Sequence, residues 1–231
     1  MPRISSITID GPAASGKTTL GKQLSDRLGF LFLDTGVMYR AVTWLALYRH
    51  VDVNDEIAVT ALAERTEIDI RSPSKADGRI NDILADGLDI TWEIRKSVID
   101  ANVSVISAYQ GVRQALMLQQ CRIAKRGPII MMGRDIGTVV LPEAELKIYL
   151  DASDETRASR RYQEIVNRGG NADYNRILLA IRERDRIDST RTFAPLKPAP
   201  DAEIINSDQM LPMDVFNHVL ELIKVRNSQD C

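Results

Sequence analysis

Gly11-Pro-Ala-Ala-Ser-Gly-Lys-Thr18 matches the pattern G-x-x-x-x-G-K-[ST], in which a loop bounded by glycines binds phosphate groups. Residues 4–9 before the loop alternate apolar and polar side chains, which predicts a strand. After it, Leu20, Leu24 and Leu28 recur every fourth residue, which predicts a helix. The glycines would let successive N–H groups point at one anion, and the helix start adds its positive end. We therefore expect the chain to bind a nucleoside triphosphate, with Lys17 at its outer phosphates and the Thr18 hydroxyl on Mg²⁺.

The composition narrows the class of protein. With 231 residues, 44% of them hydrophobic, we expect one α/β domain over residues 1–231 that carries an inserted subdomain. A net charge of −2 argues against a general nucleic-acid binder. Cys121 and Cys231 form neither a disulfide framework nor a metal-binding spacing. We find no signal peptide and no apolar run long enough to cross a bilayer, and we expect a cytoplasmic protein without a membrane partner.

Polar residues follow the second predicted strand, Phe30-Leu-Phe-Leu33. Asp34 and Thr35 come directly after it, and Arg40 lies in the first turns of the next helix. In an open parallel sheet, ligands bind outside the carboxyl ends of the strands, so these residues are candidates for a binding site. An alternative is that Asp34 or Thr35 caps the helix.

A third apolar strand, 128–132, runs into Gly133-Arg134-Asp135-Ile-Gly137. Arg134 and Asp135 would therefore lie at the same edge of the sheet as the phosphate loop. A structural ion pair between them is the alternative. With two further strands at 146–150 and 202–205, the chain is predicted to form a five-stranded parallel sheet flanked by helices.

Two segments do not fit the pattern of apolar strands and connecting helices. Residues 66–104 contain two short predicted strands, 67–71 and 79–84, which indicates a small inserted α/β subdomain. Residues 157–197 hold ten Lys/Arg against five Asp/Glu. Such a run is often only a solvated helix surface. Beside a phosphate loop, we favour an arginine-rich lid over residues 154–172 that closes over the transferred phosphoryl group and excludes water. Its candidate residues are Arg157, Arg160 and Arg161.

Four runs together resemble bacterial cytidylate kinase, over nearly the whole chain. They are Asp10-Gly-Pro-Ala-Ala-Ser-Gly-Lys17, Asp34-Thr-Gly-Val-Met-Tyr-Arg40, Gly133-Arg-Asp-Ile-Gly-Thr-Val-Val-Leu-Pro142 and Arg184-Asp-Arg-Ile-Asp-Ser-Thr-Arg191. The resemblance implies a P-loop kinase fold with residues 66–104 as a monophosphate-binding insert. It also implies transfer of the γ-phosphoryl group of MgATP to CMP or dCMP.

The resemblance also implies roles for individual residues. ATP would be bound by the loop and the start of the helix: Gly11, Pro12, Ala13, Ala14, Ser15, Gly16, Lys17, Thr18 and Thr19. The acceptor nucleotide would be bound by three groups: Ser104, Arg113 and Asp135 on cytosine, Arg40 and Arg134 on the phosphate, and Arg184, Asp188 and Arg191 on the ribose. Asp34 and Thr35 are further candidates at the acceptor site. Lys17, Arg134 and the three lid arginines would be catalytic. Thr35 stands where some members of the family have serine.

Two other functions remain open. The first is a P-loop kinase that acts on UMP, AMP or a non-nucleotide acceptor. The second is a nucleotide-driven switch, which would hydrolyse or hold ATP without an acceptor. The second cluster of rim residues and the arginine-rich segment argue against a switch, which has no need of a second phosphate site. We expect the enzyme to be a monomer that acts on small-molecule nucleotides.

Overall fold

The computed structural model describes residues 4–229, which divide into two compact units. Of the described residues, 4–29 and 130–229 form unit 1, and 30–129 form unit 2. None of the helices within residues 4–229 is long and apolar enough to span a membrane.

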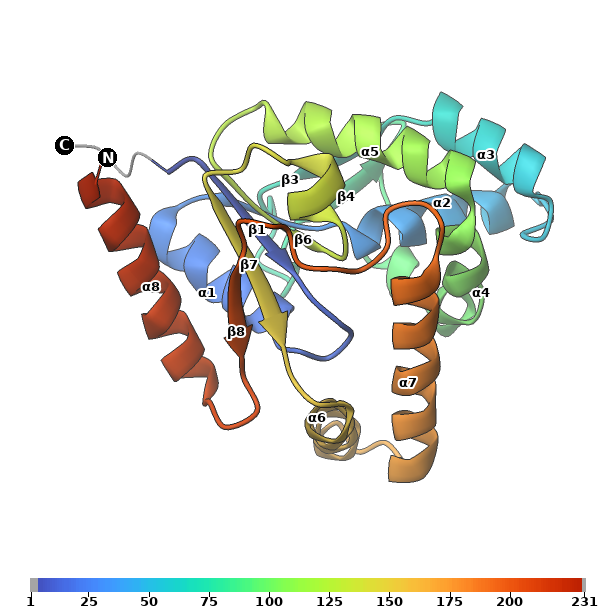
Figure 1. The fold of residues 1–231 in the computed structure, drawn as a ribbon. Helices are drawn as coiled ribbons and strands as arrows, with labels where there is room; N and C mark the ends of the chain where they lie inside the picture. The colour runs from blue at the N-terminus through green and yellow to red at the C-terminus, as the bar shows by residue number, and fades with distance from the viewer. Residues whose placement is uncertain (1–3, 230–231) are drawn as a thin grey trace. The chain divides into compact units, whose positions relative to one another are not determined.

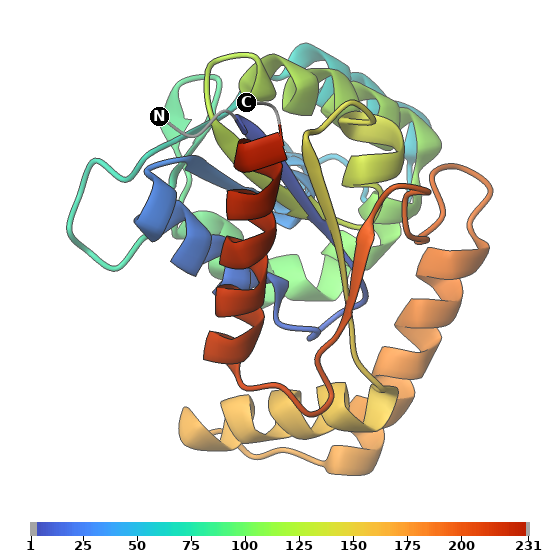
Figure 2. The same cartoon turned by 60° about the vertical axis from the view of Figure 1, so that its left-hand side comes forward.

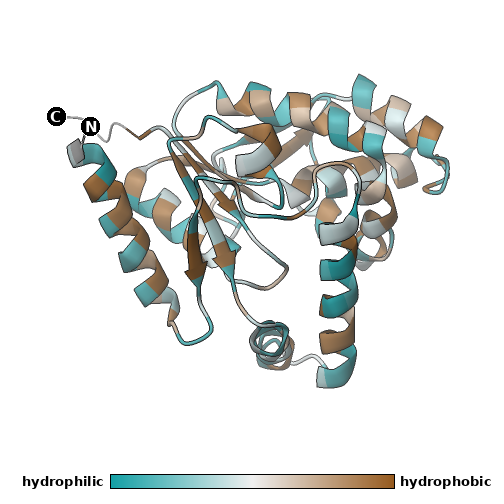
Figure 3. Cartoon of the chain, in the orientation of Figure 1, coloured by the Kyte–Doolittle hydropathy of each residue, from teal (hydrophilic) through white to brown (hydrophobic). Residues whose placement is uncertain are grey.

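Unit 1 contains the phosphate loop. Its strands are β1 (Ser6–Asp10), β6 (Ile129–Gly133), β7 (Leu146–Asp151) and β8 (Glu203–Asn206). The first residue of β6, Ile129, is the last residue of unit 2. Its helices are α1 (Lys17–Leu28), the π-helix η2 (Ile136–Val140), α6 (Asp154–Asn167), α7 (Tyr174–Thr190) and α8 (Pro212–Gln229). α1 packs against α8, beside β1 (Figure 1). α8 carries hydrophobic and hydrophilic residues in turn, as expected of a helix with one buried face (Figure 3).

The main sheet has five strands in the order β2-β6-β1-β7-β8, of which β2 (Leu31–Asp34) lies in unit 2. β7 pairs in parallel with β1 and with β8. The predicted five-stranded parallel sheet flanked by helices is therefore confirmed. Because β6, β1 and β7 are neighbours in a parallel sheet, the segments that follow these three strands leave the sheet at the same edge. The strands are held by apolar residues, and Ile7, Ile9 and Leu146 have no exposed surface.

The helices α6 and α7 form a hairpin after β7 (Figure 2). The Ser153 hydroxyl accepts a hydrogen bond from the Thr156 N–H at the start of α6, and Asp173 accepts from two N–H groups at the start of α7. Gly169-Gly170 lies between the two helices, and Gly169 has a φ of +77°.

Unit 2 combines helices with a second sheet. Its helices are α2 (Gly36–Tyr48), α3 (Glu56–Arg65), the 3₁₀-helix η1 (Glu93–Arg95), α4 (Ser97–Ala108) and α5 (Gln110–Ala124). Its strands are β2 (Leu31–Asp34), β3 (Ile68–Arg71), β4 (Asp82–Ala85) and β5 (Leu88–Asp89). The last three form an antiparallel sheet within the predicted insert 66–104. The compact unit around that sheet is larger than the insert.

Candidate active site

The phosphate loop connects β1 to α1 in a conformation that requires its glycines. Gly11 has a φ of +147°, and a Cβ atom there would overlap the carbonyl oxygen of Leu150. Gly16 has a φ of +100° and is the N-cap of α1, where it has no side chain to occupy the N–H groups of the first turn. Ala14 also has a positive φ, of 59°. The loop thus leaves the positive end of α1 open to an anion.

Lys17 and Thr18 lie in the first turn of α1, followed by Thr19. The Lys17 ammonium group is buried and donates to the carbonyl oxygen of Pro12, 2.5 Å away, inside its own loop. The Thr18 hydroxyl donates a long hydrogen bond of 3.7 Å to the Met132 sulfur, and Thr18 is exposed. Among residues 4–229, no group of three or more His, Cys, Asp or Glu side chains could hold a metal ion.

A charged cluster follows β6. The Arg134 Nε donates to Asp188 at 2.8 Å. Arg134 therefore pairs with Asp188 and not with the adjacent Asp135, which was the alternative prediction. Arg191 lies 3.4 Å from Asp188 and 3.5 Å from the Asp135 carboxylate. Arg184 reaches Asp188 at 4.0 Å. The structure therefore brings together all five predicted acceptor-site residues of unit 1.

Asp10 connects this cluster to the phosphate loop. It ends β1, is 4% exposed, and accepts hydrogen bonds from the main-chain N–H groups of Ile136 and Gly137, at 2.9 and 2.7 Å. Burial raises the pKa of Asp10 to about 6, although both N–H groups oppose the shift. The charge of Asp135 raises the pKa further and that of Lys17 lowers it.

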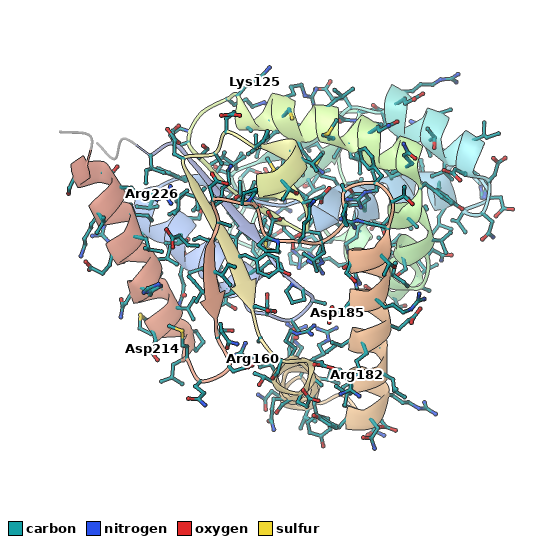
Figure 4. The ribbon with its side chains drawn as sticks, viewed as in Figure 1. Lys125, Arg160, Arg182, Asp185, Asp214 and Arg226 are labelled. Atoms are coloured by element: carbon teal, nitrogen blue, oxygen red, sulfur yellow. The ribbon has the colours of Figure 1, made fainter. Side chains whose placement is uncertain are left out.

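The three lid arginines take different directions from α6. The Arg157 side chain is 5% exposed, donates to the Ala13 carbonyl of the phosphate loop at 3.2 Å, and pairs with Asp185 of α7. Arg160 instead donates to Ser207, after β8, and Arg161 pairs with Glu164 on its own helix. Figure 4 shows Arg160 on α6 and Asp185 on the side of α7 that faces α6. Of these three arginines, Arg157 contacts the phosphate loop.

Unit 2 holds the remaining predicted residues. Both terminal nitrogens of Arg40 contact Asp100 at 2.7 Å, and its Nε donates to the Ile94 carbonyl. Asp34 accepts a hydrogen bond from the Gly36 N–H at the start of α2, as the alternative of a helix cap requires, whereas Thr35 makes no side-chain cap. The short distance between Asp34 and Gly36 in sequence makes this a local contact.

Ser104 and Arg113 lie on the consecutive helices α4 and α5 of unit 2. Arg113 is buried, its guanidinium group lies 5.5 Å from the centre of the Tyr39 ring, and it donates to the Ser107 carbonyl. Ser104 is exposed one turn before Ser107, whose hydroxyl donates to the Ser104 carbonyl. Ser107 therefore connects the two residues, because it accepts from Arg113 and donates to Ser104.

The family model described as cytidylate kinase matches residues 7–225 of the chain. The chain belongs to the cytidylate kinase family. It is 48% identical over 219 residues to the cytidylate kinase of Herpetosiphon aurantiacus, covering 95% of this chain and 94% of that protein. It is 46% identical over 221 residues to the cytidylate kinase of Roseiflexus castenholzii, again covering 95% and 94%. The resemblance to this family inferred from four sequence runs is confirmed.

A solved structure of an uncharacterized protein from Eubacterium ventriosum shares the fold, with a TM-score of 0.52 and 10% identity. The match covers 95% of this chain and 98% of that one. At this identity the likeness concerns the fold alone.

Sequence reasoning missed two side chains at the site of this cytidylate kinase family member. Asp10 belongs to the first family run and Asp185 to the fourth, but the sequence patterns assign neither of them a role. Both act through partners distant in sequence: Asp10 through Ile136 and Gly137, and Asp185 through Arg157. Their position at strand ends and beside assigned arginines was the available signal.

Proposed function

We propose that the chain catalyses transfer of the γ-phosphoryl group of MgATP to the 5′-phosphate of CMP or dCMP. The observation that carries this is the second charged cluster in unit 1: Arg134, Asp135 and Asp188 lie at the sheet edge that holds the phosphate loop, and they are joined to it by Asp10. A protein that only binds or hydrolyses ATP has no need of such a cluster. Membership of the cytidylate kinase family supports cytosine as the base of the acceptor.

The donor is held by the phosphate loop. Main-chain N–H groups from Ala13 to Thr19 surround the phosphates, and the Lys17 ammonium group leaves the Pro12 carbonyl to reach the β- and γ-phosphates. Mg²⁺ prefers oxygen ligands, and the exposed Thr18 hydroxyl offers one beside the phosphates, so the residues fit the ion. When bound, Mg²⁺ neutralises charge on the phosphates. Arg157 supplies a permanent positive charge next to the loop, and Arg160 and Arg161 would have to turn from Ser207 and Glu164 to join it.

The acceptor requires three kinds of contact. Arg134 and Arg40 neutralise its phosphate, which otherwise repels the incoming group. Arg184, Asp188 and Arg191 bind its ribose, where Asp188 accepts from the hydroxyl groups. Asp135, Ser104 and Arg113 recognise cytosine, whose C4 amino group needs an oxygen acceptor. Uracil lacks that donor and would leave a polar group of the site unpaired, which is the basis of selectivity.

The chemical step needs little covalent help from the protein. The acceptor phosphate is ionised near neutral pH because its second pKa is about 6, so no general base is required. Catalysis then consists of alignment and charge neutralisation. Asp34 and Thr35 remain candidates for support of the acceptor side. We further propose that the enzyme works as a monomer in the cytoplasm, which light scattering of the purified protein and cell fractionation would test.

A coupled ADP-release assay over CMP, dCMP, UMP and AMP tests the function. We expect fast turnover with CMP or dCMP, a rate at least about tenfold lower with UMP and AMP, and little ADP without an acceptor. Equal ADP release with and without acceptors would instead favour a switch or a hydrolase. A preference for UMP or AMP would keep the kinase and refute the cytosine pocket.

A further inference from the structure

One carboxylate joins the two halves of the proposed site within unit 1. Asp10 immediately precedes Gly11 of the phosphate loop, and its two oxygens accept hydrogen bonds from successive N–H groups of Ile136 and Gly137. Those residues directly follow Arg134 and Asp135. Any shift of the Asp10 carboxylate would therefore move the main chain that presents these two side chains.

The contact is close because residue 137 is glycine. A Cβ atom at Gly137 would lie 2.9 Å from the Thr8 hydroxyl oxygen, 3.3 Å from Lys147 Cδ and 3.4 Å from Asp10 Oδ2. The N–H groups involved belong to the first two residues of η2, whose π-helical hydrogen bonds do not serve them. Asp10 thus supplies the acceptors that the start of η2 lacks, and Gly137 makes room for it.

A second carboxylate in unit 1 also accepts hydrogen bonds from two successive main-chain N–H groups, but through a single oxygen and at a different position in the fold. Glu145 Oε2 accepts from the successive N–H groups of Ser5 and Ser6, at 2.8 and 2.7 Å. It lies before β7 and beside the start of β1, whereas Asp10 is the last residue of β1. Glu145 is exposed and joins two strand starts, while Asp10 is buried between two segments that carry site residues. Glu145 therefore only connects two strands, whereas Asp10 connects two segments of the proposed site.

Burial of a carboxylate at this point has a cost that an apolar side chain would avoid. Desolvation outweighs both N–H hydrogen bonds and raises the pKa of Asp10 to about 6. A group whose only purpose is stability is expected to have its charged form favoured in the fold. The charge at Asp10 is therefore better explained by the alignment of main-chain segments than by stability.

We propose that Asp10 is a positioning residue that sets Arg134 and Asp135 against the phosphate loop by holding the N–H groups of Ile136 and Gly137. This inference rests on the proposed function, because Arg134 and Asp135 are there assigned to the acceptor. An Asn side chain at residue 10 has one acceptor oxygen in place of two. Its amide would direct a donor at the second N–H group, and the segment 133–137 would move away.

The test compares Asp10→Asn, Gly137→Ala and the double variant with Glu145→Gln as the matched control. We expect Asp10→Asn and Gly137→Ala each to raise the KM for CMP and to lower the CMP-to-UMP ratio of kcat/KM by about tenfold, because small misplacements of binding groups have effects of this size or larger. The KM for ATP should change less than about threefold. The two changes act on one contact, so the double variant should lose less than the product of the single effects. Glu145→Gln should stay within about twofold of the parent chain.

Hydrogen exchange gives a readout that does not depend on activity. In Asp10→Asn, the amides of residues 136 and 137 should lose protection while those of β1 keep theirs. If the parent chain does not phosphorylate CMP, the proposed function fails, and exchange still reports whether Asp10 orders the segment. An unchanged CMP KM and base ratio, or a loss confined to ATP, would overturn the proposal. Should Asp10→Asn fail to fold, Gly137→Ala alone decides, by its KM for CMP and its CMP-to-UMP ratio of kcat/KM.

Discussion

Arg157 of α6 and Asp185 of α7 form an ion pair 2.5 Å long, and the same guanidinium group donates to the Ala13 carbonyl of the phosphate loop. One side chain thus connects both helices of the hairpin to the loop. The Asp185 Oδ1 atom is buried without a hydrogen-bond partner among the described residues, so Asp185 is committed to Arg157 through its other oxygen. The pair fixes the position of the Arg157 charge beside the phosphate loop.

Asp185→Asn should therefore weaken ATP binding and slow turnover. The uncharged amide holds Arg157 less firmly, and we expect the KM for ATP to rise and kcat to fall by about five- to tenfold. Glu183→Gln is the control on the same helix, because Glu183 is exposed and pairs with Arg186. Steady-state kinetics at varied ATP would measure both. A higher kcat in Asp185→Asn would mean that the pair restrains Arg157 instead of positioning it.

Lys17→Ala should remove most of the activity with little change in fold. The loss of a permanent charge at the transferred phosphoryl group is expected to lower kcat by about 10³-fold. Lys22→Ala, on the exposed side of the same helix, should stay within about twofold. Circular dichroism would establish that both variants are folded. Near-normal turnover in Lys17→Ala would exclude the phosphate loop from the mechanism.

Asp135→Ala should lower base selectivity more than turnover. Its carboxylate is the proposed acceptor for the cytosine amino group, and loss of such a contact reduces the CMP-to-UMP ratio of kcat/KM by about 10²-fold. Asp26→Asn, on the exposed surface of α1, is the control. Competition between CMP and UMP in one reaction measures the ratio directly. An unchanged ratio would move cytosine recognition away from Asp135.

Much of this arrangement could be predicted from the sequence because local patterns specify it. The G-x-x-x-x-G-K-[ST] motif fixes the conformation of the phosphate loop, and apolar runs locate the strands of the main sheet. Helix α3, β5 and η2 were not predicted. α3 is short and buries only Val59, Leu62 and Ala63, which gives a weak helical period. The first N–H groups of η2 donate to the carboxylate of Asp10, 126 residues before Ile136, so no local pattern could indicate this helix.

The partners of the site arginines could not be predicted for a similar reason. Arg157 and Arg160 both lie on α6, but one turns to the phosphate loop and the other to Ser207. Their spacing places them on neighbouring faces of a helix, and the sequence does not say which face meets the loop. Arg134 pairs with Asp188, although Asp135 is adjacent in the chain. Such choices are made by tertiary packing.

The three-stranded sheet of unit 2 should depend on Arg79. Its side chain is 3% exposed and pairs with three carboxylates, those of Asp77, Asp82 and Asp89. Arg79→Met would leave these carboxylates together with only the more distant ammonium group of Lys75 beside Asp89, and we expect the Tm to fall by about 5 °C or more at pH 7. Lys75→Met is the control, because Lys75 is exposed and lies 3.6 Å from Asp89.

The same cluster predicts a pH dependence. Hydrogen bonds from Arg79 hold the pKa of Asp77 well below its ordinary value. A depressed pKa contributes stability above the unfolded value of about 4, and this contribution is lost as the pH falls below it. The Tm difference between the parent chain and Arg79→Met should therefore shrink on acidification. Scanning calorimetry at pH 7 and pH 3 would show it, and a constant difference would contradict the ion cluster.

Asp10 predicts a pH dependence of opposite sign. Because its folded pKa of about 6 exceeds the unfolded value of 3.8, its contribution to stability is complete below pH 3.8 and is lost as the pH rises through 6. Asn at residue 10 does not titrate. The free energy of unfolding of Asp10→Asn, relative to the parent chain, should therefore increase by about 1 to 2 kcal/mol between pH 5 and pH 8.

Glu145→Gln supplies the matched comparison for that measurement. Burial raises the pKa of Glu145, but the hydrogen bonds from Ser5 and Ser6 outweigh burial and the net shift is downward. Its carboxylate stabilises the fold above the unfolded pKa, so Glu145→Gln should lose stability relative to the parent chain as the pH rises from 3 to 6. Urea unfolding of the three proteins between pH 3 and pH 8 would resolve both slopes. If Asp10→Asn followed the slope of Glu145→Gln, the Asp10 carboxylate would be a stabilising contact, and its retention would need no role in aligning the site.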